Sequence, residues 1–258
     1  MHAGPARRLV NTHHNGDHCW GNQLFEGAEI IGHRRCAHAM MHDMTPAQFV
    51  ELLRTQSDSP GFAIMARDTA EFDFSGIELV PPTTLVDERM TVDLDGKPAE
   101  LIYVGPAHTE GDLIVHLPED GVVFGGDVIW SSCTPIGWEG TYENWWAALE
   151  LVLSLEPRVV VPGHGPITDA DGVRELARYL HYVRDESAAH HAAGLTPLEA
   201  AKKIDLGPYA DWTEPERLIF NVHRAYLELE GRRFDATEHV APWFYEMGLL
   251  ADHRAAQT

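Results

Sequence analysis

The sequence predicts an α/β fold in which strands and helices form layers around one core, followed by a helical C-terminal part. Short apolar runs bounded by turn residues are typical of strands, and they alternate with helical segments up to about residue 168. With 258 residues, 44% of them hydrophobic, the chain can bury a sizeable core. We expect a core over residues 1–168 and a helical extension over residues 169–258 that packs on it.

The first elements are short strands and helices. Strands are predicted at 7–10 and 27–32, and helices at 34–41 and 46–55. Thr45 and Pro46 are the expected cap and first residue of the second helix. Residues 56–76 are polar and irregular, with a short helix expected at 62–67. We interpret this stretch as a flap over the functional site.

The middle of the chain is rich in strands and the end is helical. Strands are predicted at 77–80, 84–86, 90–94, 100–104, 113–117, 122–124 and 159–161. Helices are predicted at 142–155, 171–192, 197–203, 214–230 and 241–248. The pattern indicates no repeat and no clear linker.

Composition excludes several classes of protein. The formal charge of −21 opposes binding to phosphate backbones, so we expect no nucleic-acid partner. No apolar run is long enough to span a bilayer, and no signal-peptide pattern opens the chain. Three cysteines without CxxC spacing favour free thiols in a reducing compartment. We predict a cytoplasmic protein that acts on a small molecule.

One stretch is unusually rich in metal-binding side chains. Thr12 to His18 reads Thr-His-His-Asn-Gly-Asp-His, with three imidazoles, a carboxamide and a carboxylate in six residues. Without a partner, these groups would repel one another on partial protonation and leave many polar atoms to satisfy. Imidazole and carboxylate are the usual donors to zinc-like ions, so the stretch predicts a metal site.

Three later segments carry similar residues beside glycines. They are Gly105-Pro106-Ala107-His108-Thr109-Glu110-Gly111-Asp112, Gly125-Gly126-Asp127 and Pro162-Gly163-His164-Gly165-Pro166. Each follows a predicted strand, and loops at one edge of a layered sheet converge. Glycines allow turns and a close approach of the backbone that other residues do not.

Together these segments resemble the metallo-β-lactamase-fold hydrolases, whose first motif is His-x-His-x-Asp-His. The resemblance spans residues 13–164 and implies an αββα four-layer sandwich with two metal sites. Site one would contain His13, Asn15 and His108, and site two would contain Asp17, His18 and His164, with Asp127 bridging the two. It implies one or two divalent ions, most often zinc.

Asn15 is the departure from the family pattern, which has histidine there. A carboxamide oxygen is a weak, neutral donor, so we expect site one to be weakened or empty, or to prefer a harder ion such as manganese or iron. His14 is an alternative ligand, although alternation directs it away from its neighbours. We therefore favour a solvent-facing or supporting role for His14 over metal binding.

The beginning of the chain is short for this family. Only residues 1–12 precede the first motif, where relatives usually have several strands. We interpret this as a shortened variant or a chain whose N-terminal strands are missing. Exposed sheet edges would then cause poor solubility or formation of homo-oligomers.

The resemblance implies metal-dependent hydrolysis of an ester, thioester, lactone or amide by metal-bound hydroxide. Asp17 is both a ligand and the candidate catalytic base. Trp130 and Trp138 are candidate substrate-binding residues for an apolar or aromatic acyl group, although core packing is the alternative for both. The rival function is a non-hydrolytic, polyketide-cyclase-like protein or a silent binding protein, because Asn15 depletes the first site.

Overall fold

The computed structural model describes residues 6–257. Its strands form a three-stranded sheet of β1 (Arg8–Val10), β2 (Glu29–His33) and β3 (Thr84–Val86), and a five-stranded sheet of β4 (Arg89–Leu94), β5 (Lys97–Tyr103), β6 (Leu113–Leu117), β7 (Val122–Trp130) and β8 (Val159–His164). The first sheet is parallel throughout. The second is antiparallel except for the parallel pair β7–β8.

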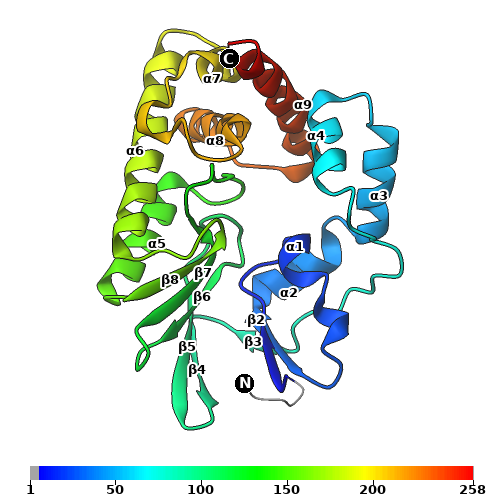
Figure 1. Ribbon diagram of the computed structural model, residues 1–258, viewed down its shortest axis with the longest axis vertical. Helices are drawn as coiled ribbons and strands as arrows, with labels where there is room; N and C mark the ends of the chain where they lie inside the picture. Colours follow the sequence, from blue (N-terminus) through cyan, green and yellow to red (C-terminus); the bar gives the residue numbers. More distant parts are fainter. Residues whose placement is uncertain (1–5, 258) are drawn as a thin grey trace.

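Helices cover the outer faces of both sheets (Figure 1). The helices are α1 (Gly16–Cys19), α2 (Arg34–His42), α3 (Pro46–Thr55), α4 (Pro60–Asp68), α5 (Tyr142–Ser154), α6 (Ala170–Ala192), α7 (Pro197–Lys203), α8 (Leu218–Leu229) and α9 (Ala236–Ala255), with short 3₁₀ turns at Asn22–Leu24, Gly207–Tyr209 and Pro215–Arg217. α2 packs on the first sheet, whereas α5 and α6 contact β7 of the second. The order of layers is therefore helix, sheet, sheet, helix, as the family resemblance implied.

Two hydrophobic clusters hold these layers together. The smaller one joins Ile31 and Val86 of the first sheet to Leu101 and Leu113 of the second. The larger one fills the space between the second sheet and the C-terminal helices, and its fully buried residues include Leu149 of α5. Since α6, α8 and α9 contribute to this cluster, the C-terminal helices share one core with the sheet.

Local sequence explains the helix starts that were predicted best. α3 and α7 each begin with a threonine followed by proline, and each has a complete capping box. Thr45 accepts a hydrogen bond from the backbone of Gln48, and Thr196 accepts one from Glu199. The caps satisfy backbone donors that the first turn leaves unpaired.

Beyond shifts of a few residues in the bounds of several elements, three predicted elements differ from the structure. Residues 77–80 are not a strand, because their backbone pairs with side chains: Val80 O accepts from Asn22 and Glu78 N donates to Gln23. β7 continues to Trp130, so Asp127 lies within a strand and not at its end. α9 extends over twenty residues with Pro242 inside it, whereas the predicted helix covered only 241–248.

The predicted flap is anchored at its helical part. α4 packs against α9, and the ring of Phe62 stacks on that of Phe244 at 5.2 Å. Gly61 allows this approach, because a Cβ there would lie 1.7 Å from Phe244 O. Figure 1 places α4 beside α9 and α3 on the outer side of α4, with both above α1. Within the described range 6–257, no helix has the length and apolar character that crossing a bilayer requires.

Candidate metal centre

Four separate segments of the chain bring the predicted ligands together. His13 and Asn15 lie between β1 and α1, and α1 itself carries Asp17 and His18. His108 lies in the turn between β5 and β6. Asp127 is on β7, and His164 is the last residue of β8, the parallel neighbour of β7.

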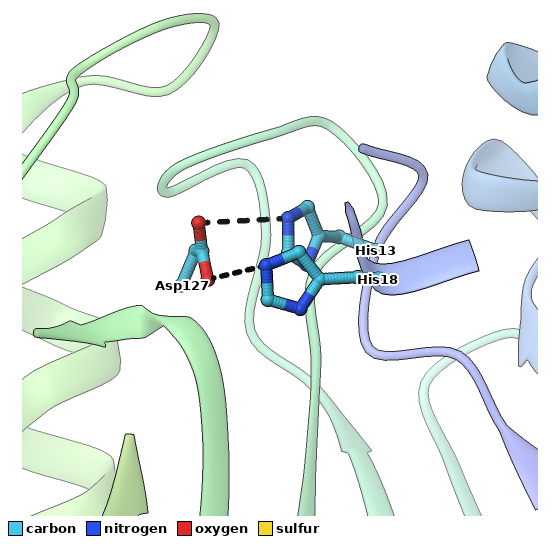
Figure 2. A group of neighbouring side chains, drawn as sticks. All are labelled: His13, His18 and Asp127. Atoms are coloured by element: carbon cyan, nitrogen blue, oxygen red, sulfur yellow. Dashed lines mark ion pairs between the residues drawn. The ribbon is translucent and has the colours of Figure 1, made fainter. Parts of the chain in front are cut away.

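Asp127 is at the centre of the group. Its Oδ1 lies 3.2 Å from His18 Nε2, and its Oδ2 lies 3.7 Å from His13 Nε2, 3.4 Å from His108 Nε2 and 3.3 Å from His164 Nε2. Figure 2 shows His13 and His18 directed at the two oxygens of this carboxylate. The carboxylate is 4% exposed, so one buried anion faces four imidazoles.

A second group shares two of these imidazoles. Asp17 Oδ2 lies 3.2 Å from His18 Nε2 and 3.3 Å from His164 Nε2, and the two Nε2 atoms are 3.2 Å apart. Asp17 is 59% exposed, in contrast to Asp127. These are the residues expected for site two.

The residues expected for site one form an acceptor-rich group. His108 Nδ1 lies 2.8 Å from Ile136 O, and because a carbonyl only accepts, Nδ1 must carry the ring proton. Burial lowers the pKa of His108 to about 4, so the ring is neutral and Nε2 presents a lone pair. That lone pair faces Asn15 Oδ1 at 2.8 Å and Asp127 Oδ2 at 3.4 Å.

Two further atoms support a cation at this position. His13 Nε2 and Asp127 Oδ1 are buried without a hydrogen-bond partner. A buried polar atom without a partner lowers the stability of the fold by about 1–3 kcal/mol. Both of these atoms lie within the same cluster of potential metal-ligand atoms. Imidazole nitrogens and carboxylate oxygens in this arrangement match the donor set of a zinc-like ion. The residues present therefore fit a divalent metal.

Electrostatics separates the buried imidazoles from the outer ones. Burial holds the pKa of His13 well below its usual value, as it does for His108. Burial opposes protonation of His164 too, but the carboxylates of Asp127 and Asp17 outweigh it and raise its pKa to about 10. The imidazoles in turn overcome the effect of burial on Asp17 and Asp127 and keep the pKa of each below its usual range.

Asp112 supports His108 and was not identified from the sequence as a site residue. It is buried and accepts hydrogen bonds from the backbone of Ala107 (3.1 Å), His108 (2.8 Å) and Thr109 (2.9 Å) and from Thr109 Oγ1 (2.6 Å). Burial raises its pKa to about 7 against these bonds. The sequence did contain a signal that could have identified Asp112, because this aspartate directly follows His-Thr-Glu-Gly and directly precedes an apolar strand.

His14 belongs to a different group. Its Nε2 lies 2.7 Å from Asp43 Oδ2, and Glu139 is close enough for the three ligand atoms to lie within 4.8 Å of one another. Glu139 also donates its backbone N–H to His108 O at 3.2 Å. The structure thus directs His14 toward Asp43, while Asn15 takes the place beside His108.

The two tryptophans proposed as substrate contacts pack into the protein. Trp130 is 2% exposed and stacks on His164, with ring centroids 4.4 Å apart. Trp138 is half-buried among the rings of Phe220, Phe234 and Phe244. Their contact with a substrate stays a prediction.

Comparison with known proteins places this geometry in a family. The linear primary-alkylsulfatase of Pseudomonas sp. (strain ATCC 19151) is 22% identical over 231 residues, 80% of this chain and 44% of that protein. The hydroxyacylglutathione hydrolase of Maricaulis maris (strain MCS10) is 24% identical over 151 residues, 57% of this chain and 43% of that protein. The chain spans less than half the length of either relative.

The fold agrees with a solved structure over most of the chain. The stereoselective inverting sec-alkylsulfatase from Pseudomonas sp. has a TM-score of 0.61 and 15% sequence identity, over 88% of this chain and 42% of that one. The model of the metallo-beta-lactamase superfamily matches residues 3–164, which include all seven converging side chains. This chain therefore belongs to the metallo-beta-lactamase superfamily.

Proposed function

We propose that this chain is a metal-dependent hydrolase that cleaves an ester-type bond of a small molecule. The observation that carries the proposal is the convergence of His13, His18, His108 and His164 on the buried carboxylate of Asp127. Imidazole nitrogens gathered around a buried carboxylate suit a divalent ion, and this arrangement has no evident role in packing.

The proposed ligand sets follow the two groups of side chains. Site one consists of His13, Asn15 and His108, site two of Asp17, His18 and His164, and Asp127 bridges them. Site two has two imidazoles and two carboxylates, so we propose that it binds its ion more tightly. Asn15 contributes only a neutral oxygen to site one, and that site would hold zinc weakly or take manganese or iron.

The chemistry supplied by the ion is the activation of water and the polarisation of the bond to be cleaved, since a bound water can reach a pKa near 7. Asp17 is positioned to accept a proton during attack, because its carboxylate borders site two and is 59% exposed. Asp127 is buried and surrounded by imidazoles, so it holds the site together and stays ionised. His18 and His164 orient the Asp17 carboxylate between them.

The substrate class is an ester, thioester, lactone or amide, to which the relatives add sulfate esters. The relative named as an alkylsulfatase matches 80% of this chain, a larger share than residues 1–168 alone can account for. Trp20, two residues beyond His18, packs with Phe49 and Phe74 at 5.6 and 5.8 Å. This aromatic group beside α1 supports an apolar or aromatic organic part in the substrate.

The test is a substrate screen on metal-reconstituted protein. Aryl esters, acyl thioesters, lactones, amides and alkyl sulfates would be offered to wild type, Asp127→Asn and Asp17→Asn. We expect turnover of at least one class by wild type, its loss in both variants, and its loss on chelation. Leu24→Ala, at a residue 79% exposed, serves as a control that should keep full activity. Turnover that persists in Asp127→Asn would contradict the proposal.

Asn15 favours one second candidate, a non-hydrolytic ring-closing or binding protein. A site one that binds no ion leaves a single metal, and that ion could hold a ligand without cleaving it. No turnover of any class by fully metal-loaded wild type, together with a ligand-dependent rise in Tm, would favour this candidate.

A further inference from the structure

Trp130 lies behind the metal centre and contacts three of its proposed ligands. In the β7–β8 pairing it is the partner of His164, and the neighbouring Ser131 N donates to His164 O at 3.1 Å. The indole stacks on the His164 ring at 4.4 Å with an interplanar angle of 20°. The strand register therefore holds the two rings face to face.

The same indole reaches Asp127 and His108. Its Nε1–H donates to Asp127 O at 2.6 Å, which fixes the backbone that carries the bridging carboxylate. The centroids of the indole and the His108 ring lie 6.0 Å apart, in an edge-to-face arrangement with an interplanar angle of 62°. Because the side chain is 2% exposed, a substrate could reach it only by displacing the residues around it.

The C-terminal part of the chain contacts this indole from outside the metallo-beta-lactamase match. Arg217 Cζ lies 5.6 Å from the Trp130 ring centroid, within the range of a cation–π contact, and its guanidinium pairs with Glu214. Thr213 anchors this segment beside the strand, since Thr213 N donates to Ser132 O and Thr134 N donates to Thr213 O.

We propose that Trp130 is a positioning residue for the metal centre, which fixes the His164 ring and the Asp127 backbone, and that Arg217 supports it from the helical extension. The inference rests on the proposed metal function. His108 has its Nδ1 fixed by Ile136 O, whereas the ring of His164 is fixed by the indole face. Supporting contacts of this kind orient ligands and raise metal affinity.

The chain contains a matched control. Trp146 stacks on His181 at 3.9 Å and 16°, and neither residue belongs to the ligand group. Replacing Trp146 removes an indole–imidazole stack of similar geometry, with no expected effect on the metal. The test compares Trp130→Phe, Trp130→Leu and Arg217→Gln with Trp146→Phe and Trp146→Leu.

Two readouts are independent of activity. The dissociation constant for Zn²⁺ comes from competition with a chromophoric chelator, and the geometry of the site comes from the visible spectrum of the Co²⁺-loaded protein. We expect about a 10-fold or greater loss of affinity and a changed Co²⁺ spectrum in Trp130→Leu. Trp130→Phe should lose less Zn²⁺ affinity than Trp130→Leu, because it keeps an aromatic face for His164. It should still lose some affinity, because it lacks the Nε1–H that bonds to Asp127 O. The Trp146 variants should retain wild-type affinity even where Tm falls.

Arg217→Gln removes the cation that lies over the Trp130 ring and leaves Trp130 itself unchanged. We expect a smaller loss of affinity than in Trp130→Leu, restored by Arg217→Lys, which keeps the cation. If Trp130→Leu fails to fold, Trp130→Phe and Arg217→Gln still decide the question. Wild-type affinity and spectrum in both would overturn the inference. Absence of metal binding in wild type would instead overturn the proposed function.

Discussion

Gly163 leaves the space that the bridging carboxylate occupies. A Cβ at this position would lie 1.9 Å from Asp127 Oδ1 and 2.9 Å from the Asp127 backbone nitrogen. The glycine is therefore required by the close approach of β8 to the metal centre. His13 and His18 could be named as candidate ligands from the density of metal-binding side chains around them, and Asp127 from the resemblance to a known family. That Trp130 lies behind them could not, because its contacts arise from strand register.

Gly163→Ala is expected to displace Asp127 and weaken metal binding at both proposed sites. We expect a loss of affinity of about 10-fold or more, measured by chelator competition, since the displaced residue bridges the two ligand sets. Gly21→Ala is the control, because no atom lies within 4 Å of a Cβ there. Equal affinity in the two variants would contradict the packing argument.

At the scale of elements, the carboxylate of Asp112 holds the turn between β5 and β6 in place. Asp112 accepts from three consecutive backbone N–H groups and thereby fixes the position of His108. The sequence predicted both flanking strands and the histidine between them, because apolar alternation and glycines are local signals. It missed Asp112, and wrongly predicted a strand at 77–80, because side-chain bonds to a backbone depend on contacts formed only after folding.

Asp112→Ala is expected to lower the free energy of unfolding by about 3 kcal/mol or more, because it leaves several buried donors unpaired. Metal affinity should fall in parallel, since His108 loses its support. Chemical denaturation and chelator competition measure the two effects. Thr109→Val removes only the hydroxyl bond to Asp112 and should cost much less. A stable Asp112→Ala protein with wild-type affinity would show that the turn is held by other contacts.

Across the whole molecule, the sheet and the C-terminal helices share a core, and the metal centre lies at one edge of it. The sequence predicted a helical extension over residues 169–258 that packs on the core, because no clear linker precedes it. It did not predict that α4 would be anchored to α9, which depends on the fit of Gly61 against Phe244. The same fold gathers carboxylates and imidazoles so closely that protons and metal must compete for them.

We expect His164 to release about one proton per chain when metal binds at pH 7.5, because its pKa is about 10 beside Asp17 and Asp127 and the ring must deprotonate to bind. The pKa of His164 in the folded, metal-free protein lies above the unfolded value of 6.5. Protonated His164 therefore stabilises the metal-free fold fully below pH 6.5. That stability is lost as the pH rises through about 10. Calorimetry in buffers of different ionisation enthalpy measures the protons, and His164→Asn should remove the release.

The most direct test of the account is the metal content per chain, measured by elemental mass spectrometry on wild type and Asn15→His. The account predicts one tightly held ion in wild type, at Asp17, His18, His164 and Asp127, and two ions in Asn15→His, where an imidazole completes site one. Two tightly held ions in wild type would contradict the weakness assigned to site one. No bound ion in either protein would contradict the metal centre itself.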